Sequence, residues 1–186
     1  MKALPVLFIL AAAIPFQAGG DATNPSGIAR EHVANFQPEI GRWAVVNSVM
    51  KGPGAFEELH FIIETAPILD GLGVKTDWYD AGTGNFFGEV IRTYNPAAGV
   101  VDQLYFAGKR SSWSTTAQAV TFSETGYSTS FSGEDQFGAF DARSQTTYLP
   151  DEGGYDWTIE RRYDGGDWFV IDQGEARPLP AADRPI

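Results

Sequence analysis

The sequence predicts an all-β protein, folded as an up-and-down antiparallel β-barrel of about 8 to 10 strands with a short N-terminal helix. Three observations carry this prediction: short segments in which apolar and polar residues alternate, turn-forming residues between these segments, and the lack of a long connection that could hold a crossover helix. Strands joined by short turns are antiparallel neighbours, and closing the series into a barrel removes its exposed edges. A two-sheet sandwich is the alternative architecture.

The candidate strands are about eleven segments, each roughly six to eleven residues long and rich in β-branched and aromatic residues. They span Trp43–Met50, Phe56–Thr65, Leu72–Tyr79, Phe86–Tyr94, Val100–Phe106, Ser111–Ala117, Ala119–Glu124, Tyr127–Ser132, Ala139–Leu149, Tyr155–Tyr163 and Trp168–Arg177. Some of these segments could fuse into longer strands. Turn-forming clusters such as KGPG at 51 and NPAAG at 95 separate them, and these residues are typical of hairpin turns.

The chain is predicted to form one domain, because no repeat or change of composition interrupts residues 28–177. At its start, apolar residues at helical spacing predict a helix over Ile28–Phe36, which Pro38 stops. Residues 21–27 are expected to be a flexible leader, and residues 178–186 a Pro-rich tail.

Residues 1–20 have the layout of a secretory signal peptide. One lysine precedes a run of apolar residues, and small residues end at Gly20. The apolar run is too short to span a bilayer. We therefore expect cleavage within two residues of Gly20 and a periplasmic or secreted bacterial protein without a membrane anchor.

The composition argues against several classes of partner and cofactor. With 24 acidic and 13 basic residues the net charge is −11, whereas nucleic acids and anionic membranes attract clustered Lys and Arg. The absence of cysteine excludes a disulfide framework and a lipid-anchor cysteine. The two histidines, His32 and His60, lie in different predicted elements, so neither a metal site nor a cofactor is expected.

The Gly41-x-Trp43 sequence at the first strand resembles the Gly-x-Trp signature of the lipocalin and calycin barrels. The order of IGRW, APILDGLG, TDW and YNPAAG is also similar to a narrower bacterial family, a domain of unknown function with a lipocalin-like barrel, although VVDQLYF after the last turn departs from that family's aromatic pattern. The resemblance implies that Trp43 lies on the barrel floor and that an arginine of a late strand, here Arg177, stacks over it. Any pocket is then expected at the opposite end.

His60 is the most informative single candidate for chemistry. In EELHFIIE it shares one strand face with Glu58 and Glu64. If this face lines the lumen, the carboxylates favour the charged imidazole, which suits acid–base chemistry or an anionic ligand. If the face points outward, His60 is solvated, and outward polar faces are the more common arrangement.

Other candidates come from polar and aromatic residues on separate strands. The set considered for ligand binding comprises His60, Trp78, Arg92, Tyr94, Tyr105, Arg143 and Tyr163. Most aromatic residues are expected to fill the core, with Trp78 and Tyr105 as the first exceptions. The sequence leaves open which face of each strand points into the lumen. Gly73 or Gly88 could mark a β-bulge, and a bulge would reverse the two faces.

The leading functional hypothesis is a barrel that binds a small, largely hydrophobic or aromatic molecule. The alternative is a barrel-type enzyme, an isomerase, cyclase or decarboxylase, that uses His, Arg, Tyr and Glu of the lumen. A structural or interaction protein with an exposed aromatic edge is a third possibility. No catalytic residue is assigned.

Overall fold

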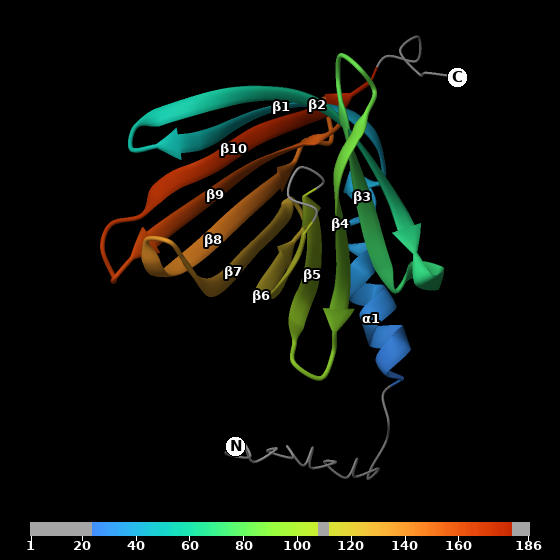
Figure 1. Ribbon diagram of the computed structural model, residues 1–186. Coiled ribbons are helices and arrows are strands. Elements are labelled where there is room, and N and C mark those ends of the chain that lie inside the picture. The colour runs from blue at the N-terminus through green and yellow to red at the C-terminus, as the bar shows by residue number, and fades with distance from the viewer. Residues whose placement is uncertain (1–23, 108–111, 180–186) are drawn as a thin grey trace, which may run out of the picture.

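The protein is one closed antiparallel barrel of ten strands, as a computed structural model describes it over residues 24–107 and 112–179 (Figure 1). Each strand pairs with its neighbours in sequence, and β1 pairs with β10 to close the ring. The predicted up-and-down barrel is thereby confirmed. No helix within these residues is long and apolar enough to cross a membrane.

The elements follow one another without a crossover. They are α1 (Pro25–Ala34), η1 (Gln37–Glu39), β1 (Gly41–Gly52), β2 (Ala55–Ile68), η2 (Leu69–Gly71), β3 (Gly73–Asp80), β4 (Phe86–Asn95), β5 (Val100–Ala107), β6 (Ser112–Ser123), β7 (Gly126–Asp135), β8 (Gly138–Tyr148), β9 (Tyr155–Tyr163) and β10 (Phe169–Pro178). The two candidate segments at 111–117 and 119–124 are one strand, β6, because the alternation runs on through buried Gln118.

The ends of the chain differ from the expectation in detail. The helix starts at Pro25, inside the predicted leader, because proline is compatible with a first helical turn. Pro178 still belongs to β10. The predicted signal peptide at 1–20 and the tail from 180 onward lie outside the described residues.

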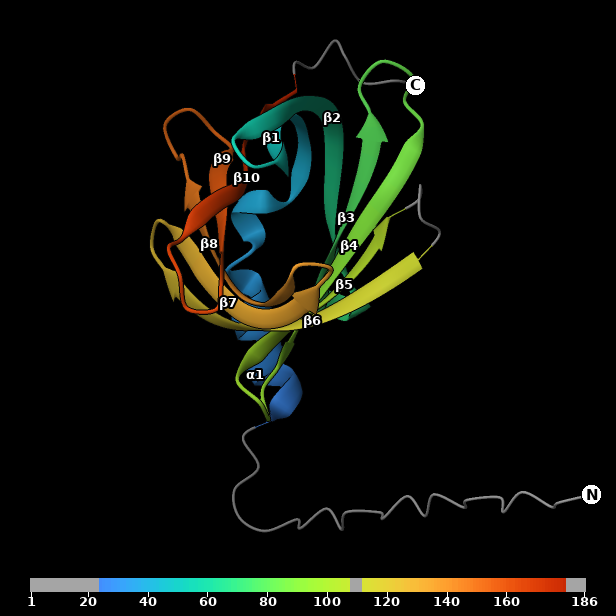
Figure 2. The ribbon, with the colours of Figure 1, turned by 60° about the vertical axis from the view of Figure 1, so that its left-hand side comes forward.

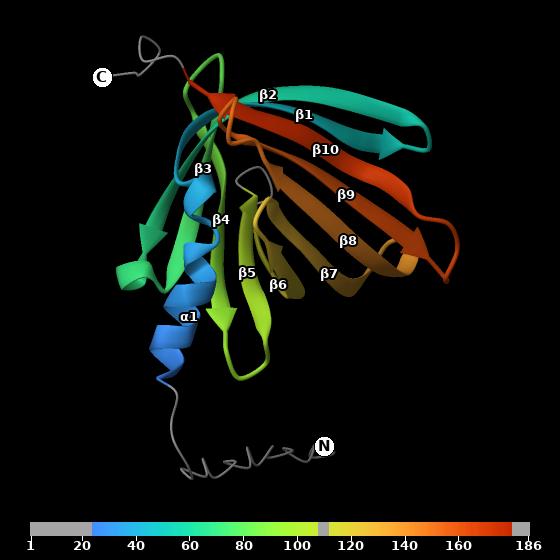
Figure 3. The ribbon, with the colours of Figure 1, turned by 180° about the vertical axis from the view of Figure 1, so that it is seen from behind.

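One end of the barrel is covered by α1, and we call it the closed end. The helix contacts β3, β4 and η2 (Figure 3), and Ala29 and Val33, four residues apart, share its buried face. The chain then passes within the ring of strands on its way to β1 (Figure 2). Phe36 is only 1% exposed there and packs with Val74 and Val101. The opposite end, at the β1–β2, β3–β4, β7–β8 and β9–β10 turns, we call the mouth.

The inward-facing positions follow from the pairing register. A second core cluster joins Val45 of β1, Phe61 of β2, Tyr155 of β9 and Ala176 of β10. The register shifts at three places, and the shift between Val170 and Asp172 changes which face of β10 looks inward. As a result Asp172 lies opposite inward-facing Ile159 rather than on the outer surface.

Candidate functional site

The inner wall near the mouth is aromatic and only half-buried. Its partly buried rings include Trp78, Phe87, Tyr105 and Phe131, and Trp157 lies further in, next to Tyr155. Inward-facing residues at the closed end, by contrast, reach 1–2% exposure, as Val45, Val74 and Val101 do. Side chains therefore fill the barrel at its closed end, while apolar surface near the mouth stays accessible to solvent.

Trp78 is the centre of the aromatic contacts on this wall. Its ring lies 5.3 Å from that of Tyr105, 5.8 Å from that of Phe61 and 5.9 Å from that of Phe87. Tilted pairs at these separations are favourable aromatic contacts. The wall thus holds Trp78 and Tyr105, two sequence-predicted candidates, side by side inside the barrel.

Asp172 adds a carboxyl group to the same lumen. Its Oδ1 accepts a hydrogen bond of 2.7 Å from Trp157 Nε1, and its Oδ2 accepts one of 3.3 Å from Asn47 Nδ2. Burial raises the pKa of Asp172 above its ordinary value, although these two hydrogen bonds lower it in part. Asn47 Oδ1 is buried and has no hydrogen-bond donor within the described residues.

The position of the Trp157 ring depends on a glycine in the neighbouring strand, β10. Gly174 pairs with Trp157, and a Cβ at Gly174 would overlap the indole ring. Because glycine has no side chain, the ring can lie against the β10 backbone and direct its N–H to Asp172.

Tyr163 belongs to a polar cluster at the mouth. Its hydroxyl donates to Asp135 Oδ2 at 2.7 Å, and Arg161 Nη1 donates to the same oxygen at 2.6 Å. The Arg161 guanidinium lies 3.9 Å from the centre of the Phe140 ring. Arg161 is therefore already neutralised by Asp135.

Arg92 is placed at the closed end rather than in an accessible lumen. It is 8% exposed and forms an ion pair with Glu39, which is 3% exposed. Its guanidinium also lies 4.4 Å from the centre of the Phe36 ring. Arg92 Nη1 donates to the Tyr127 hydroxyl at 2.9 Å, and burial raises the pKa of Tyr127. This cluster is suited to holding the floor together.

Tyr94 also lies at the closed end. Its ring stacks on His32 of α1 with centroids 3.9 Å apart. This contact between Tyr94 and His32 helps to hold α1 against β4. It places Tyr94 away from the aromatic wall.

His60 and Arg143 face outward. His60 Nε2 lies 2.8 Å from Glu58 Oε1, and both side chains are mostly exposed. Arg143 Nε donates to Glu160 Oε2 at 2.6 Å, and its guanidinium lies over Trp168 on the outer surface. Neither side chain faces the inner wall that holds Trp78 and Tyr105.

The floor differs from the arrangement that the resemblance implied. Trp43 does lie at the closed end, where its Nε1 donates to the Glu39 carbonyl at 2.8 Å. Arg177 does not stack over it, because Arg177 alternates with inward-facing Ala176 and so points outward. There it bonds Asp156 at 2.7 Å and Glu175 at 3.0 Å. The buried arginine of the floor is Arg92.

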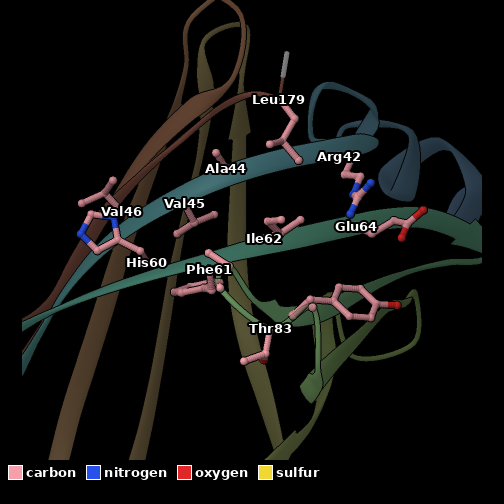
Figure 4. Close-up of a pocket in the computed structure, with 14 residues that line it drawn as sticks. Arg42, Ala44, Val45, Val46, His60, Phe61, Ile62, Glu64, Thr83 and Leu179 are labelled. Carbon is pink, nitrogen blue, oxygen red and sulfur yellow. The ribbon is translucent and has the colours of Figure 1, made fainter. Parts of the chain in front are cut away.

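An open groove of about 960 Å³ lies on the outside of β1 and β2, next to the β3–β4 turn (Figure 4). Its polar lining residues include Arg42, His60 and Glu64, together with outward-facing apolar residues such as Ile62. Arg42 Nε is buried in this region without a hydrogen-bond partner within the described residues. A second groove of about 420 Å³ crosses the outer face of β6–β9. Both lie outside the aromatic lumen.

Sequence reasoning missed Asp172, Asn47 and the Glu39–Arg92 pair. Strict alternation from Ala176 would carry Asp172 inward, but alternation from Phe169 would carry it outward, so only the position of the bulge decides. Glu39 lies before the first strand, where no alternation indicates which way it points.

No group of three or more His, Asp or Glu side chains that could hold a metal ion occurs in residues 24–107 and 112–179. No family model and no curated protein matches the chain. Among solved structures, the chain is similar to the crystal structure of Rv2717c from M. tuberculosis. The TM-score is 0.44 and the identity 11%, over 78% of this chain and 98% of that chain.

Proposed function

We propose that the barrel binds a small, largely hydrophobic molecule in its lumen, near the mouth and away from Trp43. The observation that carries the proposal is the partly buried ring cluster of Trp78, Phe87 and Tyr105 on the inner face near the mouth, where apolar surface stays more exposed than at Val45, Val74 and Val101. Apolar surface that faces inward and stays wet is stabilised when a ligand covers it.

The dimensions of the barrel support this proposal. About eight strands leave an interior that side chains can fill or that holds one small ligand, and ten strands enclose a wider one. Phe36 and the side chains packed around it occupy one end of this space; they are Val33, Val74, Val101 and Tyr127. The aromatic wall forms part of the remaining inner surface, and its rings suit a flat or apolar molecule.

We also propose that the chain is a calycin-like barrel related to lipocalins, and that it is exported. Support for the first comes from Gly41-x-Trp43 at the start of β1, with Trp43 at the closed end. Support for the second comes from the signal-like composition of residues 1–20. Expressing the full chain in a bacterium and measuring the N-terminal residue of the exported product tests the second point, since retention of Met1 in the cytoplasm contradicts it.

The enzyme alternative required His60, Arg92, Arg143 and a tyrosine to converge in the lumen. His60 and Arg143 lie on the outer surface, and Arg92 is paired with Glu39 under Phe36. No observation of the site therefore favours the alternative over ligand binding.

A neutral apolar dye, N-phenyl-1-naphthylamine, tests the proposed function by its fluorescence increase on binding. We expect saturable binding to the wild-type protein and at least about threefold weaker binding to Trp78→Leu, because loss of a central aromatic contact costs roughly 1 kcal/mol or more. Trp113→Leu is the matched control, since Trp113 is 51% exposed on the outer surface. Absence of saturable binding, or equal loss in both variants of confirmed fold, contradicts the proposal.

A further inference from the structure

Asp172 differs from other carboxylates inside the barrel in its partners. Glu39 pairs with Arg92, and Asp135 pairs with Arg161. Asp172 receives hydrogen bonds from two neutral groups, and no basic side chain of the described residues pairs with it. A half-buried carboxylate without a cationic partner is costly unless a further group compensates it.

The surroundings of Asp172 have spare acceptor capacity. Each of its oxygens accepts one protein hydrogen bond, whereas an ionised carboxyl group has about four acceptor sites. Beside it, Asn47 is 7% exposed and directs Nδ2 to Asp172, which leaves Asn47 Oδ1 as another acceptor without a donor. This corner of the lumen needs hydrogen-bond donors.

The same corner is flanked by the ring of Trp157. The indole N–H is committed to Asp172 Oδ1, and packing against Gly174 sets the plane of the ring. Aromatic faces attract cations as well as apolar groups. The site therefore combines an anionic acceptor, a neutral acceptor and an aromatic surface.

We propose that the ligand is an apolar or aromatic amine whose protonated nitrogen donates to Asp172. The inference rests on the proposed function, since it names the class of molecule that the lumen takes. Asn47 Oδ1 is the second acceptor, and Trp157 lies beside the ammonium group. An ammonium ion has only donors, and its hydrogen bond to a carboxylate is charge-assisted.

Two further properties agree with a cationic ligand. The net charge of −11 attracts cations towards the protein. Burial raises the pKa of Asp172, and a bound ammonium lowers it again, so binding and ionisation of the carboxyl group favour each other.

Three probes with the same ring system test the inference by isothermal titration calorimetry on the full chain. They are 2-naphthylmethylamine, 2-naphthylmethanol and 2-naphthoate, which carry a cation, a neutral hydroxyl and an anion. We expect the amine to bind at least about tenfold more tightly than the alcohol, as a charge-assisted hydrogen bond predicts, and the carboxylate to bind most weakly.

Asp172→Asn removes the charge while keeping the shape and an acceptor for Trp157. The variant is expected to lose the preference for the amine and to bind the alcohol within about twofold of wild type. Glu175→Gln is the matched control, because it removes one negative charge from the outer face of the same strand, where Glu175 pairs with Arg177. This control should keep the preference.

The outcomes separate the two proposals. If the alcohol binds and the amine is not preferred, or if Asp172→Asn keeps the preference, the lumen binds ligands but the amine inference is overturned. If none of the three probes and no neutral dye binds, both proposals are overturned. The comparison of the three probes on wild-type protein does not depend on how any variant folds.

Discussion

Arg92 and Glu39 form an ion pair within the closed end of the barrel. Two guanidinium nitrogens of Arg92 donate to the two carboxylate oxygens of Glu39, at 3.3 and 2.5 Å. Arg92 belongs to β4, whereas Glu39 belongs to the segment that leads from α1 into β1. The pair therefore ties the N-terminal segment to the far wall of the barrel.

Breaking this pair from one side should destabilise the fold strongly. Arg92→Met leaves the Glu39 carboxylate buried without compensation, which costs about 3–5 kcal/mol in the free energy of unfolding. The double variant Arg92→Met/Glu39→Leu should lose less than the sum of the single changes, because no unpaired charge remains. Urea unfolding measures all of these. Arg143→Gln is the control, since the surface ion pair of Arg143 with Glu160 is worth less than about 1 kcal/mol. If Arg92→Met lowers the free energy of unfolding no more than Arg143→Gln does, the prediction is contradicted.

Asp172→Asn should stabilise the protein at neutral pH. The folded-state pKa of Asp172 is raised, so its contribution to stability is present below the unfolded-state pKa and is lost as the pH rises through the folded-state pKa. At pH 7 the charged group is therefore a cost, and its removal should raise the free energy of unfolding. Thermal unfolding of both proteins between about pH 3.5 and pH 7 checks this. The advantage should shrink towards low pH, and a less stable variant at pH 7 is the contrary result.

Gly126→Ala should be poorly tolerated. Gly126 has φ of +146°, and a Cβ there would overlap the carbonyl oxygen of Thr146 on the neighbouring strand. We expect a loss of more than about 3 kcal/mol, because backbone strain and a clash with main chain add together. Gly99→Ala is the matched control: its φ is +68°, nothing lies within 4 Å of a Cβ, and about 1 kcal/mol is expected. Similar melting temperatures for the two variants would argue against this account.

Trp43→Phe should lower the free energy of unfolding by about 1 kcal/mol, because the Glu39 carbonyl loses the Trp43 indole N–H as its donor, 2.8 Å away. Trp113→Phe, on the outer surface, should change stability by less than about 0.5 kcal/mol.

Arg177→Gln should leave the fluorescence emission of Trp43 unchanged, because Arg177 bonds Asp156 and Glu175 on the outside. A shift of that emission, measured with the other four tryptophans replaced by phenylalanine, would place Arg177 next to Trp43 after all.

Much of the fold could be predicted because strand formation and turns depend on local sequence. Alternation and Gly-rich turns indicated the strands, and short connections indicated the order in which they pair. The resemblance of Gly41-x-Trp43 to the lipocalin signature implied that Trp43 lies on the barrel floor, and Trp43 does lie at the closed end. Trp78 and Tyr105 were expected to line a pocket as exceptions among the aromatic residues; they face inward in contact with each other, and their role toward a ligand stays a prediction.

Other candidates could not be placed from the sequence, because a strand has two faces and its residue types alone do not show which face points into the barrel. His60 and Arg143 had the residue types of a site but lie outside, and Arg92 found its partner 53 residues earlier in the chain. Such pairings depend on register between distant strands, which local periodicity does not contain.

The sequence by itself determined the all-β class, the antiparallel order of the strands and the high aromatic content of the chain, because these depend on residue type and short spacings. The tertiary structure alone decided that Asp172 enters the lumen. One extra residue, Ile171, shifts the register of β10 against β9 and turns the following residues to the opposite face. A carboxyl group then meets Trp157 and Asn47 in an aromatic interior, because a bulge reverses side-chain direction without leaving a mark in the alternation.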